Sequence, residues 1–420
     1  MNDIQIQGRY PVYGELVTQG SKNAVLPLMA ASLLHPGVTI LEHVPDITDV
    51  DSMVGILQGL GARIIRRGGE MQIDASCLTS CEISLDYVRR MRSSIMVLGP
   101  LLARMGRAVT YYPGGCSIGK RPVDYHIRLL RDLGISVTEE GDRIEACAQR
   151  YRGTRLTLEF PSVGATENAI MAAVGAQGET VIHGCAREPE IVELCLFLAA
   201  MGIEVIGAGT DRIVVRGQRS CRDPHWRVRG DRIAAGTYLA AAAVSGGEIC
   251  LKEAPVEWMG STLQALCAGG CQIQTADQTI WLRAPRYLRA IPQLETAVYP
   301  GFPTDMQSIM LAVQCCSSGE GLLRENIFEG RFETAAELVR MGADIRIEDR
   351  VARTCGTGRL KGADVTARDL RGGAALIVAG LGAEGQTRIR QCGHIDRGYE
   401  HIVTNLQQLG ARIWRVPGDD

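Results

Sequence analysis

Aromatic residues, net charge and long hydrophobic runs are all scarce in this sequence. Phe, Trp and Tyr make up only 5% of the 420 residues, which leaves few side chains for stacking on nucleic-acid bases. The net charge is −2, whereas a nucleic-acid-binding domain would carry a basic face. No apolar run approaches the roughly 20 residues that a membrane-spanning helix needs. We therefore expect neither a nucleic-acid partner nor a membrane partner.

Signals for metals, nucleotide cofactors and export are also missing. The 14 cysteines include no Cys-x-x-Cys pair, and no Walker-type loop is present. The stretch from Gly380 to Gly385 has the glycine spacing of a dinucleotide-binding motif, but it ends a predicted helix. Residues 1–13 have no basic and apolar signal region, and nearly all cysteines are expected as small buried side chains in a reducing compartment. We expect a cytoplasmic protein without metal or cofactor, and the sequence does not indicate its oligomeric state.

A short phrase recurs six times along the chain. In each copy a helix end is followed by Gly, a small residue, any residue and an aliphatic residue, as in Leu60-Gly61-Ala62-Arg63-Ile64. The central glycines lie at positions 61, 134, 202, 270, 342 and 410, so successive copies are 73, 68, 68, 72 and 68 residues apart. Such a phrase is typical of a helix that ends at a Gly and passes directly into a strand.

A second phrase, an Ala-rich segment that ends near a Gly and precedes a short strand, alternates with the first. Each repeat of roughly 70 residues thus holds two helices and several strands, too little to bury its own faces alone. Six repeats in 420 residues predict an α/β fold of two domains with three repeats each. We expect one domain at residues 21–229 and a second at 1–20 plus 230–420. The N-terminal strand has no helix of its own and is expected to close the C-terminal domain.

The Ala-rich segments are apolar nearly all round, which is typical of helices buried inside a domain. Polar residues stand at their starts, and these include the cations Lys22, Arg92 and Arg371. Ordinary helix caps explain Ser and Asp at such positions. They do not explain Lys and Arg, because the helix dipole disfavours positive charge there. We therefore expect that helix starts gather into an anion-binding site, with buried parallel helices surrounded by sheets.

The stretch from Tyr111 to His126 contains three glycines and two prolines between a predicted strand and a predicted helix. This composition predicts a loop able to move as a lid. Cys116 lies in it close to Lys120 and Arg121, and the two cations favour the thiolate form. Cys116 is thus the one cysteine for which we expect a chemical role.

With this loop the sequence resembles the UDP-N-acetylglucosamine enolpyruvyl transferases, which begin bacterial peptidoglycan precursor synthesis. The resemblance covers essentially the whole chain. It also rests on 20–24, 91–95, 162–166, 187–191, 299–307, 325–332 and 394–400. It implies two inside-out α/β domains of three repeats each. It further implies that the enolpyruvyl group of phosphoenolpyruvate is transferred to the 3-hydroxyl of UDP-N-acetylglucosamine through a tetrahedral intermediate, with release of phosphate.

The resemblance also implies site residues. For phosphoenolpyruvate these are Lys22, Asn23, Arg121, Arg331, Arg371 and Arg397, and guanidinium groups suit both its phosphate and its carboxylate. Catalytic roles fall to Lys22, to Cys116 and to Asp305. Cys116 is the family's loop cysteine, which is alkylated by fosfomycin, and its roles as proton donor and product-release gate stay open. Asp305 takes the hydroxyl proton or orients the hydroxyl, since nearby arginines make a carboxylate a weak base.

For the UDP-sugar the resemblance implies twelve residues. They are Asn23, Arg92, Arg121, Pro122, Val123, Asp124, Tyr125, Ser162, Val163, Gly164, Asp305 and Ile327. The stretch Ser162–Gly164 opens a helix whose amides suit the diphosphate. Some relatives carry Lys where this chain has Phe160, which shifts the expected diphosphate contacts toward Lys120 and Arg121. Glu188 and Asp231 match family motifs, with structural and functional roles equally open.

Two alternatives stand beside this interpretation. The shikimate-pathway enolpyruvyl transferase shares the fold and reaction, but the Gly-Gly-Cys loop and Asn23 speak against it. A non-catalytic relative that binds a UDP-sugar would be expected to have lost charged site residues, and Lys22, Asp305 and Arg397 are all present.

Overall fold

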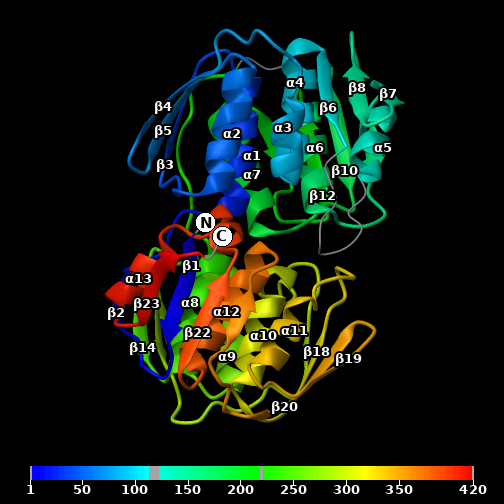
Figure 1. The fold of residues 1–420 in the computed structure, drawn as a ribbon. Helices are drawn as coiled ribbons and strands as arrows, with labels where there is room; N and C mark the ends of the chain where they lie inside the picture. The colour runs from blue at the N-terminus through cyan, green and yellow to red at the C-terminus, as the bar shows by residue number, and fades with distance from the viewer. Residues whose placement is uncertain (1, 113–122, 218–220, 419–420) are drawn as a thin grey trace. The chain divides into compact units, whose positions relative to one another are not determined.

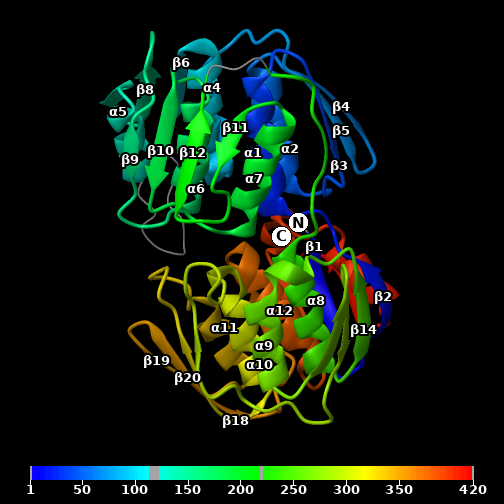
Figure 2. The ribbon, with the colours of Figure 1, turned by 180° about the vertical axis from the view of Figure 1, so that it is seen from behind.

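The computed structural model describes residues 2–112, 123–217 and 221–418. Contacts divide the described chain into two compact units. We call the unit from Gly20 to Val228 the N-terminal unit, and the unit formed by the residues up to Gln19 and those from Arg229 onward the C-terminal unit. Each has its own contiguous cluster of buried hydrophobic residues. Both are drawn in Figures 1 and 2.

The Ala-rich segments form six helices, three in each unit. They are α1 (Lys22–Ala31), α4 (Leu98–Met105), α6 (Val163–Ala173), α8 (Arg232–Ser245), α10 (Gln307–Cys315) and α12 (Leu370–Gly382). Most of their residues are buried, which confirms the prediction of internal helices. Small side chains let them pack closely, α4 against α6 and both α8 and α10 against α12. Short 3-10 turns extend the set, namely η1 (Ser32–Leu34), η2 (Arg92–Val97) and η4 (Thr304–Met306).

The glycine phrase ends a second set of six helices. These are α2 (Thr48–Gly59), α5 (Asp124–Asp132), α7 (Pro189–Ala200), α9 (Gly260–Ala268), α11 (Thr334–Arg340) and α13 (Ile402–Gln408). The glycine that follows each helix has φ between 84° and 106°, a region that only Gly adopts without strain. The six-fold prediction is therefore confirmed in backbone conformation. The remaining helical turns are α3 (Leu85–Arg90), η3 (Val256–Trp258) and η5 (Cys392–Arg397).

Six small sheets share one strand order. The strand that follows each buried helix is β3 (Val38–Glu42), β6 (Arg107–Tyr111), β10 (Glu179–His183), β14 (Glu248–Lys252), β18 (Ser318–Arg324) or β22 (Gln386–Arg390). Its antiparallel neighbour is β5 (Glu70–Asp74), β8 (Arg143–Cys147), β12 (Arg212–Arg216), β16 (Thr279–Arg283), β20 (Val351–Thr357) or β1 (Asn2–Gln7). Beyond that neighbour lies β4 (Arg63–Arg67), β7 (Ser136–Glu140), β11 (Glu204–Ile206), β15 (Gln272–Ala276), β19 (Ile345–Glu348) or β23 (Arg412–Pro417).

The other edge of each sheet is closed by a parallel neighbour. It is β13 (His225–Arg227), β9 (Arg155–Thr157), β2 (Tyr13–Val17), β17 (Leu294–Glu295) or β21 (Asp364–Thr366), and in the second repeat a single bridge from Glu82 to Val109. In each unit of Figures 1 and 2 the central helices are enclosed by such sheets. The predicted α/β architecture of buried helices surrounded by sheets is thus present.

Strand β1 completes the sixth sheet, which belongs to the other end of the chain. It pairs antiparallel with β22, where Ile4 lies opposite Ile389, and with β23, where Ile6 lies opposite Ile413. Ile4 and Ile6 are fully buried, so the strand contributes to the core of the C-terminal unit as well as to its sheet. The prediction that the N-terminal strand closes this unit is confirmed.

Candidate functional site

The predicted site residues stand mostly at the starts of buried helices. In the N-terminal unit these residues are Lys22 and Asn23 on α1, Arg92 on η2, and Val163 and Gly164 on α6. Asp124 and Tyr125 open α5, just after Val123. In the C-terminal unit Asp305 lies on η4, Arg371 is the second residue of α12, and Arg397 ends η5. Cys116, Arg121 and Pro122 lie outside the described residues.

Lys22 is a cation at the positive end of a helix, and a buried carboxylate balances it. Its Nζ lies 2.7 Å from Oδ2 of Asp49, whose side chain is 4% exposed. Asp49 belongs to the first turn of α2, so one helix start supplies the counter-ion for another. Ser21 caps α1 by accepting a hydrogen bond from the Ala24 amide, as the ordinary cap interpretation expects.

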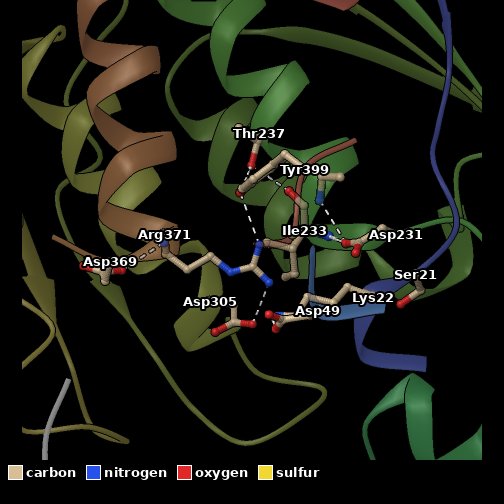
Figure 3. Close-up of polar contacts among 12 residues, drawn as sticks. Ser21, Lys22, Asp49, Asp231, Ile233, Thr237, Asp305, Asp369, Arg371 and Tyr399 are labelled. Carbon is tan, nitrogen blue, oxygen red and sulfur yellow. Dashed lines mark hydrogen bonds and ion pairs between the residues drawn. The ribbon is translucent and has the colours of Figure 1, made fainter. Parts of the chain in front are cut away.

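Asp305 is held between two buried arginines in the C-terminal unit, and Figure 3 shows its contact with one of them, Arg371. Arg331 Nη2 donates to Asp305 Oδ1 at 2.7 Å, and Arg371 Nη2 donates to Oδ2 at 3.0 Å. The arginine side chains are 4% and 6% exposed, that of Asp305 24%. This arrangement brings together three residues that the sequence predicted from separate motifs. We call it the arginine cradle.

The cradle fixes the charge state of Asp305. Burial raises the pKa of this carboxyl, but the charges of Arg371 and Arg331 outweigh burial and hold the pKa well below its ordinary value. Asp305 is therefore ionised at neutral pH, and its affinity for a proton is low. This agrees with the predicted tension between basicity and the neighbouring arginines.

Arg331 and Arg371 are also packed against aromatic rings, which fixes their guanidinium planes. Arg371 lies 5.6 Å from the ring centroid of Tyr399, and Arg331 lies 5.1 Å from that of Phe328. Arg371 Nη1 donates to the Tyr399 hydroxyl at 3.3 Å, and that hydroxyl shares a 2.9 Å hydrogen bond with Thr237 on α8. The chain from Asp305 through Arg371 to Tyr399 and Thr237 is visible in Figure 3.

The cradle contains one buried donor whose hydrogen-bonding capacity is unused. Within the described part of the chain, Arg331 Nε has no hydrogen-bond partner, although it is buried. A buried donor without an acceptor costs free energy, so such groups in native proteins often await a ligand. An anion that approached Arg331 edge-on would meet this N–H. The cradle is therefore a preformed anion-binding site. Asp305 accepts from some of the N–H groups of the two arginines, and Nε of Arg331 remains without an acceptor among the described residues.

Glu325 ties the cradle to the neighbouring loop, and no role was predicted for it. It is fully buried, and its Oε2 accepts from the Thr304 hydroxyl at 2.9 Å. Its Oε1 accepts from the amides of Ile327 at 2.7 Å and Phe328 at 3.0 Å. One carboxylate thus holds the turn that carries Asp305 and the segment that carries Ile327. The only signal in the sequence was its membership of the 325–332 motif.

The start of α6 carries the residues predicted for a diphosphate. Ser162 caps the helix by accepting from the Ala165 amide at 3.4 Å, and Val163 and Gly164 form its first turn. The first amides of a helix have no intrahelical acceptor, so they suit an anion. Phe160 is 39% exposed and supplies no charge here.

Asp231 and Asp369 act as helix caps. Asp231 Oδ1 accepts from the amides of Ile233 and Ala234, and Asp369 Oδ1 accepts from those of Arg371 and Gly372. Asp369 thereby fixes the backbone of the residue whose side chain binds Asp305. The cap gives Asp231 a structural role, and Glu188 stands at the N-cap position of α7.

The buried carboxyl of Glu167, a residue of α6, predicts a pH effect on stability. Burial, followed by the charges of Glu190 and Glu188, raises the pKa of Glu167 well above its ordinary value. Its contribution to folding is favourable below the unfolded-state pKa and is lost as pH rises through the folded-state pKa. We expect Glu167→Gln to unfold at a higher temperature than wild type at pH 8, with the difference shrinking toward pH 5. Melting curves across this range test it, and an equal difference at both ends would contradict it.

The cysteines correct one expectation. Six of the described cysteines are buried, and burial raises the pKa of Cys195 and Cys271 to about 12. Cys77, Cys147, Cys267 and Cys355 are exposed, so the prediction that nearly all cysteines are buried was wrong. The sequence identifies a cysteine as a small apolar side chain. Whether that side chain is buried depends on the face of the strand or helix that it occupies, which is set by the register of that element. The helix predicted to end near Gly380 to Gly385 does so, at Gly382.

Within the described residues, no helix is both long and apolar enough to cross a membrane. Nor do the described residues include a group of His, Cys, Asp and Glu arranged to hold a metal ion.

Known proteins resemble this chain over nearly its whole length. The family profile for EPSP synthase (3-phosphoshikimate 1-carboxyvinyltransferase) matches residues 6–406. UDP-N-acetylglucosamine 1-carboxyvinyltransferase 2 of Caldanaerobacter subterraneus is 42% identical over 99% of this chain and 100% of its own. UDP-N-acetylglucosamine 1-carboxyvinyltransferase 1 of Symbiobacterium thermophilum is 46% identical over 98% of this chain and 94% of its own.

Solved structures share the fold. The enolpyruvyl transferase NikO of Streptomyces tendae superposes with a TM-score of 0.89 at 23% identity, covering 99% of each chain. An EPSP synthase of Acinetobacter baumannii reaches 0.76 at 17% identity over 99% of this chain and 100% of that one. The family profile and the two relatives show that the chain belongs to the enolpyruvyl transferase family, among the UDP-N-acetylglucosamine 1-carboxyvinyltransferases.

Proposed function

We propose that this chain transfers the enolpyruvyl group of phosphoenolpyruvate to the 3-hydroxyl of UDP-N-acetylglucosamine and releases phosphate. The reaction supplies a precursor of peptidoglycan. The arginine cradle is the observation that carries the proposal, because two buried guanidinium groups and an unused N–H suit a ligand with both a phosphate and a carboxylate. Relatives that bear this enzyme name are 42% and 46% identical over nearly the whole chain.

The proposed reaction is an addition followed by an elimination. A proton is added to the methylene carbon of phosphoenolpyruvate while the sugar hydroxyl oxygen forms a bond to the neighbouring carbon. The hydroxyl proton leaves that oxygen. Phosphate then departs from the resulting tetrahedral carbon, and loss of a methyl proton restores the double bond. Positive charge develops on the central carbon, so the site must hold anions firmly beside it.

Lys22, Asn23, Arg121, Arg331, Arg371 and Arg397 are proposed to bind phosphoenolpyruvate. Arg331 and Arg371 support this by their burial and fixed planes, whereas Lys22 is held in place by Asp49. Asp305 is proposed to orient the attacking hydroxyl. Its low pKa favours acceptance of a hydrogen bond over full removal of a proton in the unliganded state. A ligand anion that competed for its arginines would restore basicity.

For the UDP-sugar we propose Arg92, Val123, Asp124, Tyr125, Ser162, Val163, Gly164 and Ile327, together with Asn23, Arg121, Pro122 and Asp305. The start of α6 would receive the diphosphate. Cys116 is proposed as the loop cysteine that acts on phosphoenolpyruvate and is alkylated by fosfomycin. The proposal places the reaction in the cytoplasm, in keeping with the buried free thiols of residues such as Cys195 and Cys271.

A phosphate-release assay tests the function directly. With phosphoenolpyruvate present, UDP-N-acetylglucosamine should release phosphate and shikimate 3-phosphate should not. Fosfomycin treatment should remove the activity. Release with shikimate 3-phosphate alone would assign the chain to the other acceptor, and no release with either would contradict the proposal.

Glu325 is expected to position the cradle during turnover. Glu325→Ala leaves the Thr304 hydroxyl and the amides of Ile327 and Phe328 without their acceptor, so the turn carrying Asp305 can shift. A misplacement of about 1 Å can cost about 10²-fold in rate, and we expect kcat to fall by that order. Glu325→Gln is the matched control. Its side-chain carbonyl oxygen can accept hydrogen bonds from the amides of Ile327 and Phe328, and its side-chain amide NH₂ can donate to the Thr304 hydroxyl. Equal kcat values for the two variants would contradict this role.

A further inference from the structure

Gln19 is a buried polar residue just outside the recognised motifs, and its side chain holds the main chain on both sides of Tyr399. Its exposed fraction is 6%. Nε2 donates to the Gly398 carbonyl at 3.1 Å, and Oε1 accepts from the Glu400 amide at 2.8 Å. Because a carbonyl only accepts and a main-chain amide only donates, these two bonds fix the orientation of the side-chain amide. One side chain thus binds both peptide groups that flank Tyr399.

The position of Tyr399 depends on such tethers. Tyr399 lies in the connection between η5 and α13, outside helix and strand, and it is only 1% exposed. The main-chain carbonyl of Gln19 accepts from the Asp231 amide at 2.8 Å, and Asp231 is the N-cap of α8. Gln19 therefore joins the segment that carries Tyr399 to the start of the helix that carries Thr237. The hydroxyls of Tyr399 and Thr237 meet between these two elements.

The hydrogen bonds around the Tyr399 hydroxyl run in one direction. Thr237 Oγ1 donates to the Ile233 carbonyl at 2.8 Å, which uses its only hydrogen. In the 2.9 Å bond between the two hydroxyls, Tyr399 is therefore the donor and Thr237 the acceptor. The Tyr399 oxygen accepts in turn from Arg371 Nη1 at 3.3 Å, since a guanidinium group only donates (Figure 3). The phenol oxygen is thus a fixed acceptor for one cradle arginine.

We propose that Gln19 is a positioning residue of the arginine cradle and acts on Arg371 through the Tyr399 hydroxyl. The bond from Arg371 to that hydroxyl is long at 3.3 Å, so a small shift of residues 398–400 would break it. Arg371 would then lose the contact that holds its guanidinium group while Nη2 donates to Asp305 at 3.0 Å. This inference rests on the proposed function, because phosphoenolpyruvate is the anion that the cradle is proposed to bind.

A second buried glutamine in the same unit provides a matched control. Gln314, near the end of α10, is fully buried. Its side chain also accepts from a main-chain amide and donates to a main-chain carbonyl, both of Ile291 and both at 2.8 Å. Gln19→Met and Gln314→Met each fill the site with a flexible apolar side chain and remove two such bonds. Calorimetry gives the dissociation constant for phosphoenolpyruvate, melting curves give stability, and phosphate release gives KM and kcat.

We expect Gln19→Met to raise the dissociation constant and the KM for phosphoenolpyruvate by about 3- to 10-fold, the range for a lost hydrogen bond between neutral groups. The value of kcat should change less, because Arg331 still donates to Asp305 Oδ1 at 2.7 Å. Gln314→Met should lower the melting temperature by a similar amount and bind phosphoenolpyruvate as wild type. Wild-type affinity in Gln19→Met would overturn the inference, as would an equal loss of affinity in Gln314→Met.

Tyr399→Phe tests the route from Gln19 to the cradle, because it keeps the ring beside Arg371 and removes the hydroxyl. It should weaken phosphoenolpyruvate by about tenfold, and Gln19→Met should add no further loss in this background. Losses that multiply would overturn the inference. If Gln19→Met does not fold, Gln19→Glu takes its place, since it keeps the acceptor for Glu400 and loses the donor to Gly398.

The binding and turnover measurements also separate this inference from the proposed function. If wild type and variants bind phosphoenolpyruvate in the expected pattern but wild type releases no phosphate, the proposed function fails and this inference stands. If wild type does not bind phosphoenolpyruvate, both fail.

Discussion

Replacement of Asp305 by Ala is expected to lower kcat by about 10²- to 10⁴-fold, the range for loss of a group that handles a proton in the transition state. The KM values for both substrates should change far less. The reason is that Asp305 has both oxygens fixed by buried arginines, so it offers the attacking hydroxyl an acceptor in one orientation. Steady-state phosphate release measures the effect.

The same variant separates catalysis from anion binding. Without Asp305 the cradle loses its internal anion, and Arg331 and Arg371 repel each other. We therefore expect inorganic phosphate to raise the melting temperature of Asp305→Ala more than that of wild type. Asp364→Ala is the control, since Asp364 forms an exposed ion pair with Arg390 at 2.9 Å. Unchanged turnover in Asp305→Ala would refute the assignment.

Arg371→Met is the second substitution with a large expected effect, and it acts on both stability and substrate binding. It removes one of the two cradle arginines from Asp305, together with the contacts between Arg371 and Tyr399. Breaking a buried ion pair by removing one partner costs about 3–5 kcal/mol, which should appear as a lower free energy of unfolding. The KM for phosphoenolpyruvate should rise by at least about tenfold, since a charge-assisted hydrogen bond contributes roughly 1.5–3 kcal/mol.

Arg390→Met provides the comparison for Arg371→Met. Arg390 also pairs with an aspartate, but its side chain is 43% exposed and the pair is screened by solvent. It should melt within about 0.5 kcal/mol of wild type and keep the wild-type KM. If both variants lost the same stability and affinity, the cradle would have no special role.

Features set by short stretches of sequence were predictable. The glycine at 61 and its five counterparts could be recognised because a helix that ends with φ near 90° requires Gly, and the requirement is local. The buried helices were equally visible, since an Ala-rich segment without a polar face has to be enclosed. The place of β1 could be predicted because the N-terminal strand has no helix of its own, and so it was expected to complete another repeat.

Pairings between distant segments were not predictable in the same way. Asp49 looks like any acidic residue in a first helical turn, and only the fold shows that it binds Lys22. Glu325 lay inside a recognised motif, yet its role depends on which amides face it. The 3-10 turns η2 and η4, which carry Arg92 and Asp305, were also not predictable from the sequence. The reason is that the same residue types favour 3-10 and α-helical backbone geometry.

The pairing of β1 with β22 and β23 has a consequence for biosynthesis. Ribosomes make β1 long before its two partners, since Ile4 pairs with Ile389 and Ile413 lies opposite Ile6. The described residues of the N-terminal unit all lie between Gly20 and Val228, so this unit can acquire its core before β22 and β23 are made. In the C-terminal unit β1 has neither of its two partners until β22 and β23 have been made. A nascent chain that has not yet reached these strands therefore leaves Ile4 and Ile6 without the sheet that covers them.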